Sequence, residues 1–180
     1  MAKKIILIIT LLSLAVTLSV IGAGCGPSEP SQFVTYIDEE NGFSIDHPDN
    51  WNVETPSNPP ELKVSIYEKI VGLNPVGIMV GKYQASGYDL ESFTEFRKGF
   101  LSDSCQEYVS ISTEQLTVNG IPVIKHFYTE TVGQTSYKIT EVCLIDDGTG
   151  WIVRFNSPEK SFDSYKTIYN TAFDSFRLIK

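Results

Sequence analysis

The sequence contains few of the side chains on which most catalytic and metal sites depend. Only two histidines and three cysteines occur among its 180 residues. His47 and His126 stand in no nucleophile signature, and each is expected to be a surface or core-edge residue. Neither histidine nor cysteine recurs at the spacing of zinc ligands. We therefore expect no enzyme, no metal centre and no cofactor.

Loops built for cations or phosphates are missing as well. The acidic residues 38–40 and 146–147 each precede a glycine-containing turn, but they lack the alternating ligand spacing of a calcium loop. Residues 148–150 are Gly-Thr-Gly, yet no helix follows them that could bind a phosphate. All three segments are expected to be solvated turns.

Basic residues are outnumbered and form no cluster. The chain has 14 basic and 22 acidic residues, which gives a net charge of −8. Loss of Lys3 and Lys4 with a signal peptide would make that charge more negative. Such a surface is repelled by the phosphates of nucleic acids and by anionic lipid head groups. Nucleic acid is therefore not an expected partner.

The one long apolar run lies near the start of the chain. Residues 5–21 follow Lys3 and Lys4 and are apolar except for four serines and threonines. A run of about 17 residues is shorter than the roughly 20 that a membrane span needs, and small residues rather than basic ones follow it. We interpret residues 1–24 as a signal peptide; a permanent transmembrane helix is the alternative.

A cysteine follows that run directly. Residues 22–25, Gly-Ala-Gly-Cys, resemble a bacterial lipobox, with Gly22 where that motif usually has leucine. The resemblance implies that Cys25 carries a diacylglycerol and becomes the first residue. Residues 25–32 would then be the lipidated cysteine and a short proline- and serine-containing tether. This predicts a lipid anchor at the extracytoplasmic face of the cell membrane; ordinary cleavage near Ala23 is the alternative.

Two cysteines remain once Cys25 is assigned. Cys105 and Cys143 belong to a chain that we expect to be exported, where disulfides form. A disulfide between them would contribute about 4 kcal/mol in the chain-entropy description. Two buried free thiols are equally consistent with the sequence. The sequence leaves both alternatives open.

Period-two alternation of apolar residues predicts a fold that consists mainly of strands. The first four strands are expected at residues 34–38, 43–45, 62–70 and 77–83, with turns at 41–42 and 74–75. Four more are expected at residues 107–118, 121–131, 137–145 and 151–155, with turns at 119–120, 133–134 and 147–148. The second group predicts an antiparallel meander.

Two segments have helical periodicity instead. The first follows a predicted N-cap at Asp89 and places Arg97 away from an apolar stripe of Leu90, Phe93, Phe96, Phe100 and Leu101. The second follows Pro158 and has apolar residues spaced by three and four between positions 162 and 176. Because each stripe must cover sheet surface, we predict one α+β domain over residues 33–180, an antiparallel β-sheet flanked by helices.

A short motif near the start of this domain resembles a known family. Tyr36, the segment Asn-Gly-Phe-Ser-Ile that contains Gly42 and Phe43, Pro48 and Trp51 resemble the opening of PsbP-like domains. The resemblance implies the Mog1/PsbP fold, an α/β/α sandwich. Physically, Gly42 permits a tight turn, Phe43 faces a core, and Pro48 bends the chain so that Trp51 packs inward.

The resemblance also implies a class of function, because non-catalytic extracytoplasmic proteins dominate that family. We predict a binding or complex-stabilising module whose partner is an unidentified envelope protein. The alternative is a small-ligand-binding lipoprotein with a pocket between helix and sheet. Candidates for an exposed aromatic binding face are Tyr83, Tyr88, Tyr108 and Tyr128.

Overall fold

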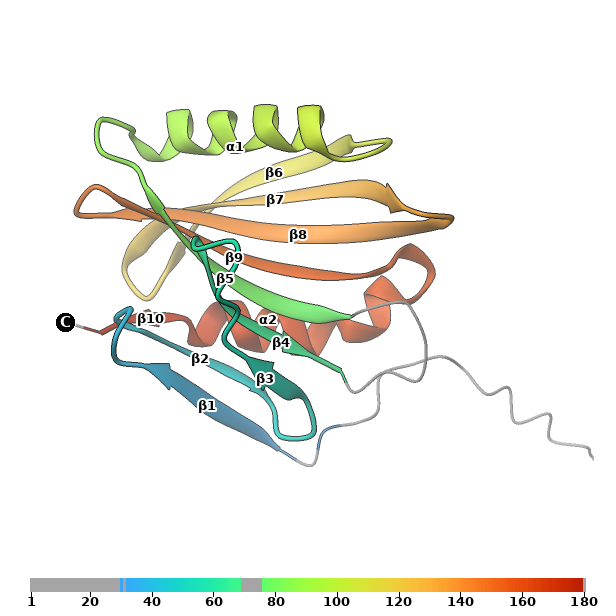
Figure 1. Cartoon of the computed structure of the whole chain (residues 1–180), viewed down its shortest axis with the longest axis horizontal. Coiled ribbons are helices and arrows are strands. Elements are labelled where there is room, and N and C mark those ends of the chain that lie inside the picture. Colours follow the sequence, from blue (N-terminus) through green and yellow to red (C-terminus); the bar gives the residue numbers. More distant parts are fainter. Residues whose placement is uncertain (1–29, 31, 69–75, 180) are drawn as a thin grey trace, which may run out of the picture.

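A computed structural model describes residues 30, 32–68 and 76–179 (Figure 1). The expected signal peptide, Cys25, most of the tether and the turn at 74–75 lie outside these described residues. Among the helices that are described, none is both long enough and apolar enough to cross a membrane.

Seven strands form one antiparallel sheet in the order β3-β4-β5-β9-β8-β7-β6 (Figure 1). The predicted meander is confirmed as its last four strands, β6 to β9. The edge strand β3 was not predicted, because its three residues are all exposed and show no alternation. The bounds are β3 Asn52–Glu54, β4 Leu62–Tyr67, β5 Gly77–Gln84, β6 Val109–Val118, β7 Ile121–Val132, β8 Thr135–Asp146 and β9 Thr149–Pro158.

A second, three-stranded sheet contains β1 (Phe33–Asp38), β2 (Phe43–Pro48) and β10 (Arg177–Leu178). The expectation of a single sheet was wrong. The two-residue β10 pairs with the start of β2, and the amide of Ile179 donates to the carbonyl of Gly42 at 2.9 Å. Gly42 has φ +80°, and an added Cβ would lie 3.1 Å from the carbonyl oxygen of Ile179. Glycine therefore permits both the turn and the approach of the C-terminal segment.

The helices begin where their sequence signals lie. Helix α1 (Leu90–Ser104) has the predicted N-cap at Asp89, whose carboxylate accepts from the amide of Ser92 while the Ser92 hydroxyl accepts from the amide of Asp89. The second apolar stripe begins as a 3-10 helix, η1 (Glu159–Tyr165), and continues as α2 (Lys166–Ser175). The prediction of a single α-helix was therefore right only for its second part.

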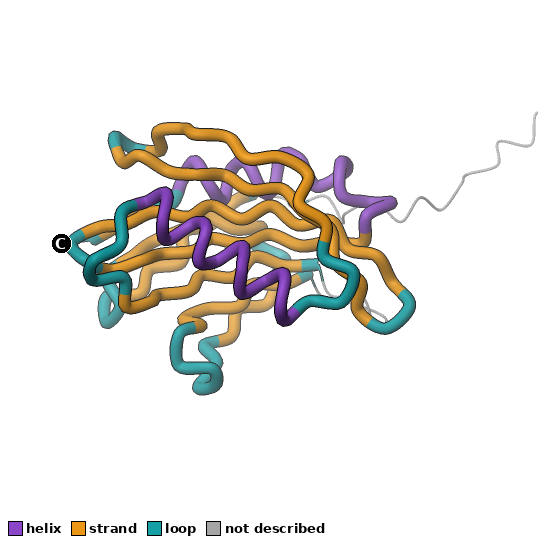
Figure 2. The backbone as a smooth tube through the Cα atoms, turned by 90° about the horizontal axis from the view of Figure 1, so that it is seen from above, coloured by secondary structure: helices purple, strands orange, loops and turns teal. Residues whose placement is uncertain are grey.

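The two helical segments cover opposite faces of the large sheet (Figure 2). Successive side chains of a strand point to opposite faces of the sheet. Ile152 therefore belongs to the cluster beside α1, and its neighbour Val153 belongs to the main core beneath α2. Helix α2 also packs on β2, so the main core is enclosed between the two sheets. The fold is mainly antiparallel sheet with helices on both faces, and its helix content is low.

The motif residues of the first strands lie in or against this main core. Phe43 is fully buried, with its ring centroid 5.7 Å from that of Trp151 and 6.0 Å from that of Tyr36. Trp51 is also buried, and its amide donates to the carbonyl of Pro48 at 3.1 Å, which closes the turn after β2. The motif thus joins the small sheet to the large one.

Glycines in the large sheet make room for two aromatic rings beside α1. A Cβ added to Gly150 would lie 2.4 Å from the ring of Phe93, and one added to Gly81 would lie 2.7 Å from the ring of Tyr83. Both distances are well below van der Waals contact. The rings therefore lie directly on the backbones of β9 and β5.

We predict opposite effects of alanine at two glycines. Gly150→Ala should lower the free energy of unfolding by about 1–3 kcal/mol, because the new Cβ displaces Phe93. Gly99→Ala on α1 should raise it by about 0.5–1 kcal/mol, because the new Cβ would meet no atom beyond the neighbouring helix backbone within 4 Å and alanine favours helix. Urea denaturation measures both. Equal effects of the two substitutions would contradict this packing of α1.

Candidate functional site

Helix α1 leaves large aromatic side chains on the surface. Phe93 and Leu101 are buried, but Phe96 and Phe100 are 55% and 51% exposed, so the expectation that the whole stripe faces the sheet was wrong. At about 100° per residue, Arg97 lies within about 40° of Leu101 on the helix circumference, whereas Phe96 lies about 100° from Arg97. A polar residue thus occupies the middle of the buried face, and the aromatic residues lie on its flank.

These flanking side chains form one wall of a cavity that we call the α1 groove. Its volume is about 450 Å³, and it lies between α1, strand β5 and the loop that joins β3 to β4. Most of its surface is apolar, and Glu61 and Arg97 are its two charged residues. The lining residues are Pro59, Glu61, Tyr83, Phe93, Phe96, Arg97, Phe100 and Ile152.

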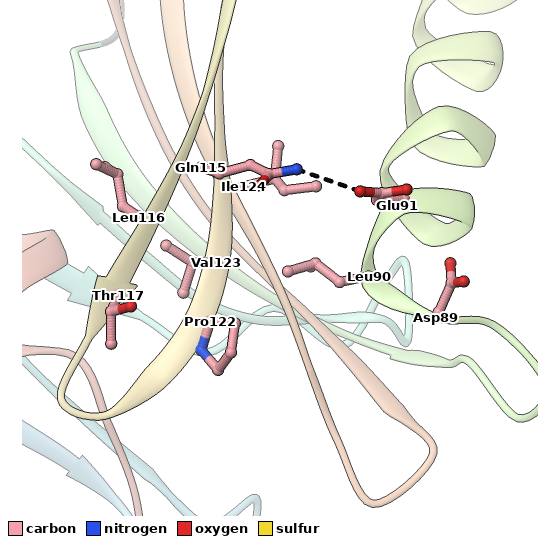
Figure 3. Close-up of a pocket in the computed structure, with 9 residues that line it drawn as sticks. All are labelled: Asp89, Leu90, Glu91, Gln115, Leu116, Thr117, Pro122, Val123 and Ile124. Carbon is pink, nitrogen blue, oxygen red and sulfur yellow. Dashed lines mark hydrogen bonds between the residues drawn. The ribbon is translucent and has the colours of Figure 1, made fainter.

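A second cavity, which we call the hairpin groove, lies on the other flank of α1 (Figure 3). It has a volume of about 630 Å³ and separates the first turn of α1 from the β6–β7 hairpin. Gln115 on β6 donates to the carboxylate of Glu91 on α1 at 3.2 Å across it. Its lining includes the carboxylates of Asp89 and Glu91 and the apolar residues Leu90 and Leu116. This groove is therefore more polar than the α1 groove.

Beneath α1 the sheet carries an unexpected cluster of buried ionisable residues. His126, Glu141 and Arg154 lie side by side on β7, β8 and β9, because each is the register partner of the next. Arg97 reaches down from α1 and donates to both oxygens of Glu141, at 2.9 Å from Nε and 3.2 Å from Nη2. Arg154 donates to Glu130 at 2.5 Å. We call these five residues the inner polar cluster.

Burial and the carboxylates determine the charge states of this cluster. Burial alone would lower the pKa of Arg97, but the charge and the hydrogen bonds of Glu141 outweigh it and raise that pKa above its ordinary value. The same balance holds for Arg154, where burial lowers the pKa and Tyr128, Glu130 and Glu141 raise it. Both guanidinium groups are therefore charged, and each has a carboxylate partner.

His126 lies at the outer edge of the cluster. It is 1% exposed, so the expectation of a surface or core-edge residue was wrong. Its Nε2 lies 3.1 Å from the hydroxyl of Ser110 and 3.3 Å from that of Tyr108. Burial lowers the pKa of His126 below its ordinary value of 6.5, although the charge of Glu141 acts in the opposite direction. The imidazole is therefore neutral at pH 7.

Ser110, His126 and a carboxylate invite comparison with a nucleophilic triad. In such a triad the carboxylate orients the imidazole, which activates the hydroxyl. Here both oxygens of Glu141 accept from Arg97 instead. Neither Ser110 nor His126 lines the α1 groove or the hairpin groove. The contact between Ser110 and His126 thus joins β6 to β7, and Glu141 joins β8 to α1.

The other candidates from the sequence are distributed over the molecule. His47 is also buried, on β2, so the expectation of a surface or core-edge residue was wrong for it as well. Its Nδ1 lies 2.8 Å from the carbonyl oxygen of Pro48. Cys105 and Cys143 are free thiols, so the disulfide alternative does not hold in this structure. They pack in different apolar clusters, and burial and then Glu130 raise the pKa of Cys105 to about 11.

The expected acidic turns and aromatic face have mixed outcomes. Asp38 is buried, so the expectation of a solvated residue was wrong for it, whereas Glu39 and Glu40 are exposed. The carboxylate of Asp38 accepts hydrogen bonds from the backbone and side-chain amides of Asn41. Among the residues that the structure describes, no three His, Cys, Asp or Glu side chains could hold a metal ion together. Tyr83 lines the α1 groove and Tyr88 contacts Phe96, whereas Tyr128 is fully buried and cannot belong to an exposed face.

Solved structures share this fold although sequence comparisons find no relative. Neither a protein-family model nor a curated protein sequence matches the chain. The solution structure of cyanobacterial PsbP (CyanoP) from Synechocystis sp. PCC 6803 matches with a TM-score of 0.64 and 17% identity, over 86% of this chain and 96% of that one. The chain therefore has a PsbP-like fold.

Two further structures match over most of their length. LpqN, described as involved in cell envelope biogenesis of Mycobacterium tuberculosis, has a TM-score of 0.58 and 12% identity over 83% of this chain and 91% of its own. A Pseudomonas aeruginosa protein of unknown function, described as a putative regulator, has a TM-score of 0.57 and 8% identity over 80% and 95%. At these identities the similarity shows the fold alone.

We predict that the pair between α1 and β8 stabilises the domain only while both partners are present. Glu141→Leu leaves the guanidinium of Arg97 buried and unpaired, and should lower the free energy of unfolding by about 3–5 kcal/mol. The double variant with Arg97→Met should lose less than that single variant. Lys98→Ala, which breaks an exposed pair with Glu95, should change stability by at most about 1 kcal/mol and serves as the control. Additive losses in the double variant would contradict the assignment.

We also predict that acidification destabilises the domain through His126. Because its folded-state pKa is lower than that of the unfolded chain, the unfolded state takes up the proton first as the pH falls. The contribution to stability is complete above about pH 6.5 and is lost as the pH falls towards the folded-state pKa. The decrease in melting temperature between about pH 7.5 and 5 should be smaller in His126→Gln. An NMR titration midpoint of His126 at or above 6.5 would contradict the prediction.

Proposed function

We propose that the protein is a lipid-anchored, extracytoplasmic protein of the cell envelope whose PsbP-like domain binds another protein and catalyses no reaction. The observation that carries the proposal is the exposure of Phe96 and Phe100, each with more than half of its surface open to solvent. Aromatic residues are enriched in protein interfaces, and clusters of them dominate binding energies. Helix α1 offers such a cluster on a rigid support.

The area involved is large enough to matter energetically. A fully covered phenylalanine buries about 150–250 Å², so covering the exposed halves of Phe96 and Phe100 would remove roughly 200 Å² of apolar surface from water. At about 25 cal/mol per Å², this corresponds to roughly 5 kcal/mol before the costs of association. A partner that covers α1 therefore gains a substantial part of its binding energy from these two side chains.

The burial and pairing of the inner polar cluster agree with a binding role. His126 is 1% exposed and contacts Ser110 and Tyr108, and its register partner on β8, Glu141, is paired with Arg97. Burial lowers the pKa of the imidazole and keeps it neutral without giving it access to a substrate. The inner polar cluster instead fixes α1 on the sheet through the pair of Arg97 and Glu141.

Placement at the envelope is supported by the start of the sequence and by a structural neighbour. Residues 1–25 have the pattern of a lipoprotein signal peptide, and Cys25 is the acceptor that the pattern implies. LpqN, which shares the fold, is described as involved in cell envelope biogenesis. Two acyl chains on Cys25 would hold the domain at the membrane stably.

A second candidate function follows from the dimensions of the α1 groove. Its volume of about 450 Å³ lies within the 300–1,000 Å³ typical of small-molecule sites, and its lining is mainly apolar. In this alternative the groove holds a small apolar ligand rather than part of a protein. A thermal-shift screen that raises the melting temperature of the wild type but not of Phe96→Ser would favour it.

We predict that Cys25 is required for membrane association. Cys25→Ser should move the protein from the membrane fraction to the soluble fraction, and the mass of the mature chain should lose the diacylglycerol. Cys105→Ser should stay in the membrane fraction, because that thiol belongs to the folded domain. A wild-type chain that is already soluble and has no lipid in its mature mass would contradict the proposal.

We predict that a partner contacts α1 in cells. Benzoylphenylalanine placed at position 96 or 100 should give one reproducible photocrosslinked species. The same group placed at Ile37, which is 56% exposed on β1, should not give it. Mass spectrometry of the crosslinked species identifies the partner. No reproducible species, or the same species from all three positions, would contradict binding through α1.

A further inference from the structure

We infer that the α1 groove binds a polypeptide segment of the partner in which an apolar side chain stands next to a lysine or arginine; the inference rests on the proposed function and adds the chemistry of the partner. Three properties of the groove lead to it. They are the shape of its apolar wall, the pairing of its arginine, and the position of its carboxylate.

The apolar wall of the α1 groove is elongated, because its phenylalanines follow one another along the helix. Phe93, Phe96 and Phe100 follow one flank of α1 at spacings of three and four residues. At 1.5 Å per residue the row is roughly 10 Å long. Tyr83 on β5 and Pro59 in the β3–β4 loop complete the lining. A row of this length suits a stretch of polypeptide with successive side chains better than a compact ligand.

The positive charge in the groove is already matched. The guanidinium of Arg97 gives its Nε and Nη2 hydrogens to Glu141, which is fully buried. Its plane also lies over two aromatic rings, with Cζ 5.3 Å from the centroid of Phe100 and 5.8 Å from that of Tyr83. An anionic ligand would meet a guanidinium whose charge Glu141 already balances, and it would therefore gain little from Arg97. The groove therefore disfavours acidic partners.

The one carboxylate of the groove, that of Glu61, is available to pair with a cation of the partner. Glu61 is exposed at the rim, and no ion pair joins its carboxylate to another residue of the described chain. The exposed faces of Phe96 and Phe100 attract a cation as well. A lysine or arginine satisfies both, since its apolar stem can lie on the rings while its charged end reaches the carboxylate.

The charge of the whole molecule acts in the same direction. The net charge of −8 increases the local concentration of basic segments near the surface and repels acidic ones. Specificity within that long-range attraction then depends on Glu61 and the phenylalanine row. The partner segment that fits combines an aromatic or leucine anchor with a neighbouring basic residue.

Panning a random dodecapeptide display library on the detergent-solubilised full chain tests the inference. Enriched peptides should contain an aromatic or leucine residue beside lysine or arginine. A synthetic copy of the most enriched peptide should bind at least about tenfold more weakly to Phe96→Ser and about three- to tenfold more weakly to Glu61→Lys. Matched controls are Ile37→Ser and Glu39→Lys, exposed residues on or beside β1, which should bind as the wild type does.

Each contrary result overturns the inference. Enrichment of acidic peptides, or peptide binding that is unchanged in Phe96→Ser and Glu61→Lys, removes the assigned chemistry. Binding of the neutral dye N-phenyl-1-naphthylamine that Phe96→Ser abolishes, with no peptide enriched, assigns the groove to a small apolar ligand instead. Thermal melts of all four variants show whether a loss of binding is a loss of folding. Photocrosslinking at 96 and 100 reports on the proposed function separately, because it requires a partner at α1 but no basic residue in it.

Discussion

The carboxylate of Glu141 has no exposure to solvent, and an unpaired charge in such a place would cost several kcal/mol. Arg97 compensates it with two hydrogen bonds, and this pair joins α1 to the middle of the large sheet. The position and rotation of α1 follow from that requirement. Because Arg97 points at β8, Phe100 and Phe96, which lie about 60° and 100° from it around the helix axis, must lie on the flank of α1.

The exposed phenylalanines are thus a consequence of the buried ion pair. In this chain the sheet side of α1 contains an arginine and a threonine, and Phe96 and Phe100 face the α1 groove. The buried charged pair beneath α1 is thus accompanied by exposed aromatic surface on its flank.

Much of the fold could be predicted because its signals are local. Turns at 119–120, 133–134 and 147–148 and the capping box at Asp89 fix the strands and the start of α1. Those two-residue turns also fix the register, so the row of His126, Glu141 and Arg154 could have been found by counting outward from 133–134 and 147–148. The pairing of Glu141 with Arg97 could not have been predicted, since no local sequence pattern indicates which residue of α1 lies above β8. The short strand β10 escaped prediction for a similar reason, because it pairs with β2, which is distant in sequence. The edge strand β3 escaped because its three exposed residues show no alternation.

The small sheet has a consequence for how the chain is made. Strands β1 and β2 come early in the domain, whereas β10, which completes their sheet, comes from residues 177 and 178. Synthesis proceeds from the N-terminus, so one edge of β2 stays unpaired until residues 177 and 178 have been made. Closing a contact across that length is entropically slow. The protein must therefore fold largely after its synthesis, and a chain that stops a few residues early loses the strand that closes it.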